Sequence, residues 1–307
     1  MESTLMKIVS FGSRGAEQPA LLTEDDRVVP LASLLADLGM APLSTVQLLG
    51  MLPQLQPLLV DALARSTAGI PRSSVRLGSP VPFPDKVIVT GANYQAHLDE
   101  ASGFTGAPSS SQPILYFKPS NMVMGATDDL PRPALTQQLD YEVELGIVIG
   151  RGGRNIPKSE AAEHIAGYVI CNDLTARDLV GRDAHIHPFF LQLTRAKGIV
   201  GAPVGPWLVT PDEVGDAQQL DIRCWINGEP RQEGNTRDMI FDIPTMVSDF
   251  SEALTLSPGD IIMTGTTAGS GAAQNPPAYL RGGDVIRMEI TGLGVMETHV
   301  VEETVPA

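Results

Sequence analysis

One twelve-residue segment, 139–150 with the sequence LDYEVELGIVIG, constrains the fold of this chain more than any other. Its apolar side chains recur at every second position over most of its length, which is the period of a β-strand. The alternate positions carry Asp140, Glu142 and Glu144. Two or three carboxylates therefore point the same way from a strand that is otherwise apolar.

Two interpretations of this acidic strand follow from elementary electrostatics. The acidic face is either half-exposed and solvated, or it is buried around a cation. Buried carboxylates repel one another and are costly unless a positive charge lies between them. Hard divalent cations such as Mg²⁺, Mn²⁺ and Ca²⁺ prefer oxygen ligands. The strand alone leaves both interpretations open.

The composition restricts the class of protein. The chain has 307 residues, of which 43% are hydrophobic and 19% charged, as in a globular protein with one large domain or a large and a small one. The formal net charge of −15 would repel nucleic acid phosphates, so we predict no nucleic acid partner. Cys171 and Cys224 form no CxxC pattern, which argues against a disulfide framework or a zinc site. The sequence shows no signal peptide and no apolar run of membrane-spanning length, so we expect a cytoplasmic protein without membrane contact.

The order of predicted elements gives the fold class. Short strands with a hairpin over residues 6–30 precede leucine-spaced helices at 31–39 and 54–66 and a linker rich in Pro, Ser and Gly at 69–84. The rest is mostly strands, with helices predicted at 94–102, 158–165 and 243–254. Asn227-Gly228 is a strong hairpin turn signal. We therefore predict an α+β, β-rich protein, without the alternation of strands and helices found in parallel α/β folds.

Asp173 is the third candidate metal ligand. It follows the predicted strand 168–171, and an aspartate in such a place is usually a helix cap or a turn residue. Together with Glu142 and Glu144 it would instead supply three monodentate oxygens. Mg²⁺ keeps its remaining positions for water and substrate, so such a site can hold a chelating α-keto acid.

Two further groups of residues could carry chemistry. His97 and Glu100 are three residues apart, so on a helix they share a face, and a carboxylate bound to a histidine makes a general base. Lys197 stands among small and apolar residues and could stabilise an oxyanion or an enolate. Each has a plainer interpretation, as a surface histidine and as a lysine that reaches solvent. His185 and His187 have side chains that can bind a metal, but the carboxylates of Glu142, Glu144 and Asp173 favour a hard ion over zinc.

Taken together, these segments resemble the fumarylacetoacetate hydrolase family. The likeness runs from about Lys86 to Val300, and its markers occur in the family's order. These markers are GANYQAH, YFKP, LDYEVELGIVIG, GYVICNDLTARDL, a KG before PVGPW, ING with RQ, MIF, LSPGDIIMTGTTAG and GDVIRMEITGLG. Any one of them is weak evidence, whereas their shared order and spacing are specific.

The resemblance implies a fold, a cofactor and roles for named residues. The fold would be a mixed β-roll or sandwich core at 83–307, following a small N-terminal α+β domain and linker at 1–82, usually in a homodimer. The cofactor would be Mg²⁺ or Mn²⁺, with Ca²⁺ able to take their place in a crystal. The implied roles are metal ligands for Glu142, Glu144 and Asp173, the base dyad of the lid segment for His97 and Glu100, the active-site lysine for Lys197, and substrate binding for Arg177 and Thr266.

The chain departs from the family pattern in three places. Residues 265–271 read GTTAGSG where many members have GTPxGVG, residues 195–203 keep the lysine but replace its polar neighbours, and the DAHIHPFF segment that contains His185 and His187 is atypical. The first of these lies near the distal end of the substrate, so the resemblance does not fix the substrate.

The leading hypothesis is a metal-dependent hydrolase that cleaves a carbon–carbon bond in a β-diketo acid of the acylpyruvate or fumarylpyruvate type. The metal would chelate the α-keto acid end, and the His97–Glu100 dyad would activate water. The alternatives are an oxaloacetate-type decarboxylase, or an isomerase or hydratase of unsaturated keto-diacids, on the same metal site. A hypothesis from another class is a non-catalytic metabolite-binding protein, which predicts an incomplete set of site residues.

Overall fold

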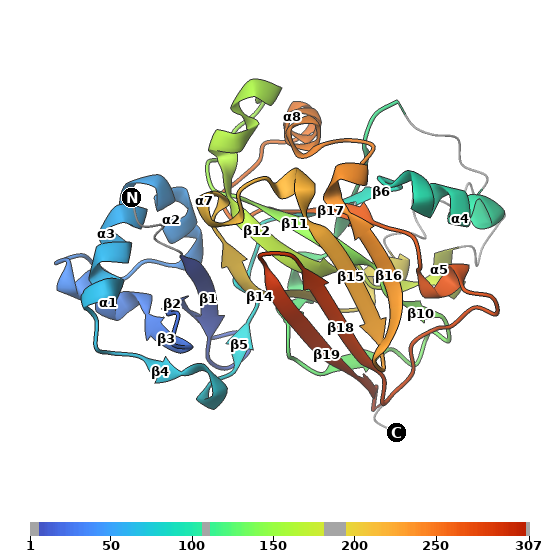
Figure 1. The fold of residues 1–307 in the computed structure, drawn as a ribbon, viewed down its shortest axis with the longest axis horizontal. Coiled ribbons are helices and arrows are strands. Elements are labelled where there is room, and N and C mark those ends of the chain that lie inside the picture. The colour runs from blue at the N-terminus through green and yellow to red at the C-terminus, as the bar shows by residue number, and fades with distance from the viewer. Residues whose placement is uncertain (1–5, 106–110, 181–194, 305–307) are drawn as a thin grey trace.

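The computed structural model describes residues 6–105, 111–180 and 195–304 of the chain. Its described part is built on two large β-sheets, one of 12 strands and one of 5, with a separate two-stranded sheet (Figure 1). The two large sheets pack face to face, because one hydrophobic cluster contains side chains of both, such as Leu145 and Ile222. A sandwich of mixed sheets with a few helices confirms the predicted α+β, β-rich class.

The acidic segment lies at the centre of the larger sheet. Strand β11 (Val143–Ile149) runs between β12 (Ile165–Asn172) and β17 (Ile261–Thr266), and all of its residues are buried. Leu145 and the other odd-numbered side chains enter the cluster between the two large sheets, whereas Val148 enters a cluster on the opposite face. The predicted alternation is confirmed, and burial of both faces excludes the solvated acidic face.

The predicted strand 139–150 is not continuous. Strand β10 (Leu139–Asp140) leaves the larger sheet and pairs with β13 (Thr175–Ala176), and β11 begins only at Val143. The backbone N–H of Glu142 in the gap donates to the side-chain oxygen of Asn172 at 3.1 Å. A side chain thus replaces a strand partner there, and the chain turns between two sheets at the residue that carries a candidate metal ligand.

The N-terminal strands extend the larger sheet. Strands β1 (Lys7–Phe11), β2 (Gln18–Leu22) and β3 (Arg27–Pro30) form an antiparallel meander, which confirms the predicted hairpin. Strand β1 also pairs with β14 (Ala202–Val209) of the core, so the N-terminal residues share a sheet with the rest of the protein.

Three helices cover these N-terminal strands (Figure 1). The two predicted leucine-spaced helices are α1 (Leu31–Asp37) and α3 (Leu52–Arg65). Between them lies α2 (Thr45–Gly50), which the leucine spacing did not predict. It begins with a capping box in which the Ser44 hydroxyl accepts from the backbone N–H of Gln47, and the Gln47 side chain accepts from the backbone N–H of Ser44.

The predicted linker at 69–84 contains regular structure. It supplies the short strands β4 (Ile70–Pro71) and β5 (Leu77–Gly78) to the larger sheet, and Val81 is fully buried. The division of the chain into 1–82 and 83–307 stays a prediction.

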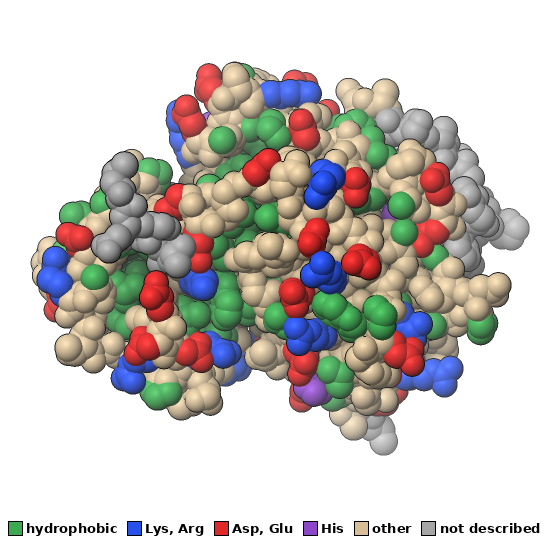
Figure 2. All heavy atoms as spheres, in the orientation of Figure 1, with side chains coloured by type: hydrophobic (Ala, Val, Ile, Leu, Met, Phe, Trp, Pro, Cys, Tyr) green, Lys and Arg blue, Asp and Glu red, His purple; other side chains and the backbone are tan. Residues whose placement is uncertain are grey.

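The smaller sheet has one buried and one solvated face. Its strands, in spatial order, are β16 (Glu229–Asn235), β15 (Asp221–Ile226), β18 (Val285–Ile290), β19 (Gly294–Glu302) and β9 (Leu130–Arg132). Asn227 and Gly228 join β15 to β16 with φ of 54° and 81°, the backbone of the predicted tight hairpin turn. Acidic and basic side chains intersperse over the outer face (Figure 2), including the pairs Arg223–Asp221 and Arg287–Glu289.

The remaining elements frame the site or close the edges of the sheets. The other strands are β6 (Val87–Gly91), β7 (Ile114–Lys118) and β8 (Val123–Gly125), and the other helices are α4 (Gln95–Thr105), α5 (Arg177–Val180), α7 (Pro211–Val214) and α8 (Ile243–Ala253). The predicted helices near 94–102 and 243–254 are confirmed as α4 and α8, and that at 158–165 is the 3-10 helix η3 (Lys158–His164). Within the described ranges, no helix is long and apolar enough to cross a membrane.

Candidate active site

Three carboxylates meet at the end of the central strands. Glu142 lies in the gap before β11, Glu144 is on β11, and Asp173 directly follows β12, which pairs with β11. One oxygen of each carboxylate lies within 4.8 Å of the others, and the three side chains belong to residues no more than 4% exposed. We call Glu142, Glu144 and Asp173 the acidic triad. The structure thus brings together the three residues that the sequence proposed as metal ligands.

Glu144 is the carboxylate of the acidic triad whose ionised form is disfavoured. Its carboxylate accepts a hydrogen bond from the backbone N–H of Gly265 at 2.8 Å. Burial, together with the charges of Asp173 and Glu142, raises the pKa of Glu144 well above its usual range. A divalent cation between the three carboxylates would remove that repulsion, and an all-oxygen ligand set suits a hard ion. The residues present therefore fit the metal that the sequence analysis expects.

Lys197 lies against the acidic triad. Its Nζ donates to Glu142 Oε2 at 2.9 Å and to Asp173 Oδ2, and it faces the ring of Tyr116 at 5.4 Å from the centroid. Burial disfavours the ammonium, but Asp173 and Glu142 outweigh burial and raise the pKa of Lys197. The lysine is therefore a buried cation, 3% exposed, at the place where a reaction could develop negative charge.

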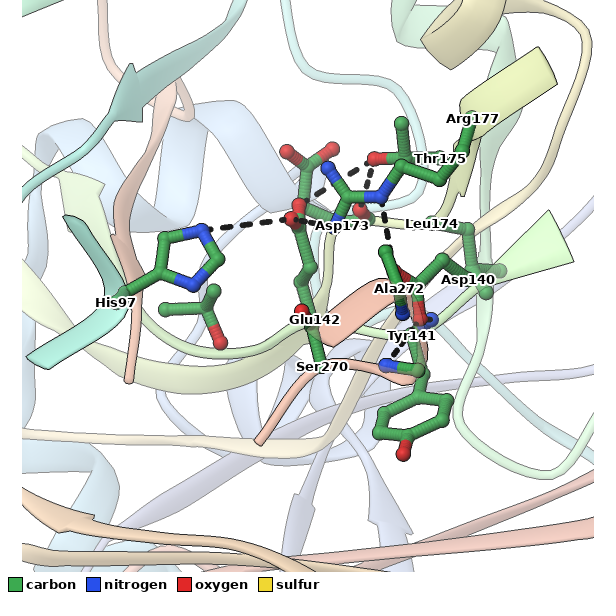
Figure 3. Close-up of polar contacts among 12 residues, drawn as sticks. His97, Asp140, Tyr141, Glu142, Asp173, Leu174, Thr175, Arg177, Ser270 and Ala272 are labelled. Carbon is green, nitrogen blue, oxygen red and sulfur yellow. Dashed lines mark hydrogen bonds and ion pairs between the residues drawn. The ribbon is translucent and has the colours of Figure 1, made fainter. Parts of the chain in front are cut away.

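Arg177 also contacts Glu142 (Figure 3). It lies at the start of α5, donates from Nε to Asp140 Oδ2 at 2.8 Å, and donates from a terminal nitrogen to Glu142 Oε1 at 2.5 Å. Burial opposes ionisation of Glu142, but Arg177, Lys197 and His97 together hold its pKa well below the usual range. Glu142 therefore forms ion pairs with Arg177 and Lys197, whereas Glu144 accepts its hydrogen bond from a backbone N–H.

His97 and Glu100 form the predicted pair on α4. His97 Nδ1 lies 2.8 Å from Glu100 Oε1, and His97 Nε2 faces Glu142 Oε1 at 4.0 Å. Burial works against the Glu100 carboxylate, but its bonds to His97 and to the backbone N–H of Gly269 lower its pKa. Glu100 therefore fixes the imidazole ring through Nδ1, and Nε2 is the ring nitrogen that faces the acidic triad.

Thr266 lies beside the acidic triad, but its hydroxyl is fully engaged. It pairs with Glu144 across β11 and β17, donates to the carbonyl of Val143 at 2.8 Å and accepts from Gln232 Nε2 at 2.8 Å. Gln232 also accepts from the Val143 N–H at 3.1 Å. The side chain thus fixes the start of β11, and its predicted role in substrate binding stays a prediction.

Sequence reasoning missed two functional candidates on β7. Lys118 is fully buried, and its Nζ donates to Asp173 Oδ1 at 3.1 Å and to the Leu174 carbonyl at 2.8 Å. The Tyr116 hydroxyl donates to Asp173 Oδ2 at 3.1 Å. Burial, with the neighbouring charge of Lys197, outweighs Asp173 and lowers the pKa of Lys118. The sequence signal that could have identified Tyr116 and Lys118 is that they alternate on one strand and both belong to the family marker YFKP.

Two of the sequence candidates cannot be placed. His185 and His187 lie outside the described residues, so their predicted contribution stays a prediction.

With this geometry in hand, similarity to known proteins indicates the class of protein. Residues 86–301 match the family described as Fumarylacetoacetate (FAA) hydrolase C-terminal. The 2,4-didehydro-3-deoxy-L-rhamnonate hydrolase of Sphingomonas sp. (strain SKA58) is 35% identical over 97% of this chain and 96% of its own length. Oxaloacetate tautomerase FAHD2A, mitochondrial, of Homo sapiens is 36% identical over 78% of this chain and 74% of its own length.

A solved structure extends the likeness to the whole fold. The crystal structure of maleylpyruvate hydrolase from Sphingobium sp. SYK-6, in complex with manganese (II) ion and pyruvate, has a TM-score of 0.79 and 30% sequence identity to this chain. The likeness covers 97% of this chain and 100% of that one. These relatives are hydrolases and a tautomerase, which supports an enzymatic function.

Proposed function

We propose that this chain, which belongs to the fumarylacetoacetate hydrolase family, is a metal-dependent hydrolase that cleaves a carbon–carbon bond in β-diketo acids of the acylpyruvate type. One observation carries the proposal: His97 Nε2 faces the acidic triad and lies 4.0 Å from Glu142 Oε1. A base in that position can take a proton from a water molecule at the acidic triad. The hydrolase relatives support the same reaction class.

The acidic triad would hold the metal. Glu142, Glu144 and Asp173 supply three carboxylate oxygens, and we propose Mg²⁺ or Mn²⁺ as the ion. When bound, such an ion supplies a Lewis acid for the oxygen atoms of an α-keto acid. The manganese and pyruvate in the maleylpyruvate hydrolase structure support this choice of ion and ligand.

The His97–Glu100 pair would activate water. Glu100 would accept a hydrogen bond from Nδ1–H of His97, so that Nε2 of His97 can accept a proton from water. The hydroxide oxygen then bonds to the distal carbonyl carbon of the substrate. Lys197 donates hydrogen bonds from the side of Glu142 and Asp173, where it can stabilise the oxygen that becomes negatively charged.

Cleavage then needs one bond to break and one proton to return. The bond between the attacked carbon and the neighbouring methylene carbon breaks, and the methylene carbon keeps the electron pair as part of a pyruvate enolate. That carbon takes the proton that His97 holds, which gives pyruvate and a carboxylic acid. Arg177, which already binds carboxylates in the site, is our candidate for binding a carboxylate of the substrate.

A second candidate function uses the same residues without an attacking water. The likeness to oxaloacetate tautomerase FAHD2A favours tautomerisation or decarboxylation of an oxaloacetate-type substrate. Both reactions pass through an enolate of the same α-keto acid end, and tautomerisation needs only proton transfer at carbon. The two candidates therefore differ in their need for an attacking water.

Parallel assays on two substrates separate these functions. The purified chain with Mn²⁺ or Mg²⁺ is incubated with an acylpyruvate and with oxaloacetate. Chromatography follows the products of cleavage and decarboxylation, and ultraviolet absorbance follows the enol form of oxaloacetate. Equal amounts of pyruvate and carboxylic acid from the acylpyruvate are expected, with none after chelation of the metal. Turnover of oxaloacetate alone would favour the second candidate. Failure with both substrates would refute these activities and favour a metabolite-binding protein.

We also propose a homodimer in the cytoplasm, as the family resemblance implied. Analytical ultracentrifugation of the full chain should give twice the 32.6 kDa mass of one chain. A sedimentation mass equal to one chain at micromolar concentration would contradict the dimer.

A further inference from the structure

Four consecutive residues, Gly269 to Ala272, connect the two groups that flank Glu142. The backbone N–H of Gly269 donates to Glu100 Oε2 at 2.8 Å, and the Ser270 hydroxyl lies 3.3 Å from Glu100 Oε1. The N–H groups of Gly271 and Ala272 donate to Asp140, at 2.7 Å to Oδ1 and 3.1 Å to Oδ2. We call residues 269–272 the bridge segment, because each half binds a different carboxylate.

Each of these carboxylates positions a group that faces the same oxygen of Glu142 (Figure 3). Glu100 binds His97, whose Nε2 is 4.0 Å from Glu142 Oε1. Asp140 binds Arg177, which donates to Glu142 Oε1 at 2.5 Å. The bridge segment therefore links His97 on α4 to Arg177 on α5, and both of these residues face the candidate metal ligand Glu142.

The backbone of the bridge segment approaches neighbouring backbone closely. Gly269 has a φ of +104°, and a Cβ there would lie 2.0 Å from the carbonyl oxygen of Arg231. A Cβ at Gly271 would lie 2.2 Å from the carbonyl oxygen of Ala278. The Tyr141 hydroxyl also donates to the Gly269 carbonyl at 3.3 Å. The segment is therefore packed tightly against residues outside it, and its contacts with Glu100 link it to α4.

Ser270 contributes the one side chain of the bridge segment that bonds to the pair on α4. It is 2% exposed, and its hydroxyl lies against the same Glu100 oxygen that binds His97. Ser270 belongs to the GTTAGSG segment, in which this chain departs from the family pattern that the resemblance implies.

We propose that Ser270 is a positioning residue for Glu100, and that its hydroxyl, together with the backbone N–H of Gly269, lets the bridge segment hold α4 in register with Arg177. The inference rests on the proposed function, because it assigns Glu100 and His97 to water activation. The hydroxyl acts by donating to a carboxylate, and such a bond in a buried site changes an equilibrium by about tenfold or more. Removing it should therefore loosen α4 without disturbing the acidic triad.

Hydrogen exchange of the full chain, read by mass spectrometry on peptides from α4, tests this proposal. Ser270→Ala should exchange about tenfold faster in α4 than the wild type, with unchanged exchange in β11 and β17. Ser270→Thr, which keeps the hydroxyl, should exchange at the rate of the wild type. Ser79→Ala is the matched control, because Ser79 is also 2% exposed and its hydroxyl bonds to the backbone of Val81. Its α4 peptides should be unchanged.

Kinetics then separate this inference from the proposed function. With Mn²⁺ present, Ser270→Ala should lower kcat for acylpyruvate hydrolysis by about tenfold and leave KM nearly unchanged. Equal α4 exchange in Ser270→Ala and the wild type would overturn the inference. Faster α4 exchange with undiminished turnover would show that Ser270 stabilises α4 without positioning Glu100 for the reaction, and would overturn the positioning role. The proposed function fails separately, if the wild type itself does not hydrolyse the acylpyruvate.

Discussion

Two glutamate-to-glutamine substitutions in the acidic triad should change the stability of the metal-free protein in opposite directions. The substitutions are Glu142→Gln and Glu144→Gln, each of which removes one negative charge and keeps the side-chain shape. Glu142 contacts two cations, Arg177 and Lys197, at 2.5 and 2.9 Å. Glu144 accepts from the backbone N–H of Gly265 and is repelled by Asp173 and Glu142. We expect Glu142→Gln to destabilise the metal-free protein and Glu144→Gln to stabilise it.

The distances in the acidic triad give the size of each effect. Its ligand oxygens lie within 4.8 Å of one another. At that separation and an effective dielectric constant of about 20, two unit charges repel by about 3.5 kcal/mol. Lys197 offsets part of this repulsion, so we expect Glu144→Gln to raise the free energy of unfolding by about 2 kcal/mol. Glu142→Gln removes one of the two carboxylate partners of Arg177 and of Lys197, and we expect a loss of about 3 kcal/mol.

The pH dependence of both effects follows from the pKa directions. The folded pKa of Glu144 is raised, so ionisation destabilises the fold progressively as pH rises above the unfolded value of about 4.3. The gain from Glu144→Gln should therefore be absent near pH 4 and grow toward pH 8. The folded pKa of Glu142 is lowered, so its stabilising contribution is present above the unfolded pKa and lost as pH falls through the folded pKa.

Urea unfolding in the presence of a chelator measures both variants directly. The free energy of unfolding of the wild type, Glu142→Gln and Glu144→Gln is compared at several pH values between 4 and 8. Losses of equal size in both variants would refute the reasoning, because they would show that Glu144 is stabilised by its surroundings as strongly as Glu142.

Three further substitutions test other parts of the structure. His97→Ala should slow acylpyruvate hydrolysis by about 10²–10⁴-fold while calorimetry shows unchanged Mn²⁺ affinity, and retained turnover would move the base role to another residue. Lys118→Met should lower the free energy of unfolding of the metal-free protein by about 3–5 kcal/mol in urea, because it removes the cation of a buried ion pair. As a control, Arg151→Met at an exposed ion pair should change it by less than about 0.5 kcal/mol. Gly146→Ala should cost about 1–3 kcal/mol in the same assay, since its Cβ would lie 2.5 Å from Cys171 Sγ; a neutral result would mean that the sheet yields at that point.

The acidic triad could be predicted from the sequence because strand periodicity places alternate side chains on one face. Glu142 and Glu144 followed from that rule, and Asp173 followed from its place after the next strand. The break between β10 and β11 could not be predicted in this way, because a side chain from another strand, Asn172, replaces the backbone partner of Glu142.

Lys118 was missed for a different reason. A lysine at the end of an edge strand normally reaches solvent, and nothing local in the sequence shows that Asp173, 55 residues away, lies against its ammonium. The contacts of the bridge segment are equally remote in sequence, since Gly269 binds Glu100 and Gly271 binds Asp140. The part of the site that was not predicted therefore consists of ion pairs and hydrogen bonds between residues that are far apart in the sequence.

The central claim is that the acidic triad binds a hard divalent cation, and a titration with Mn²⁺ tests it most directly. The metal-free wild type is titrated by isothermal calorimetry, with free Mn²⁺ followed in parallel by its electron paramagnetic resonance signal. Glu144→Gln, which should stay folded, is titrated in the same way. We predict one Mn²⁺ per wild-type chain and loss of that site in Glu144→Gln. Equal Mn²⁺ binding by the two proteins, or none by the wild type, would contradict the claim.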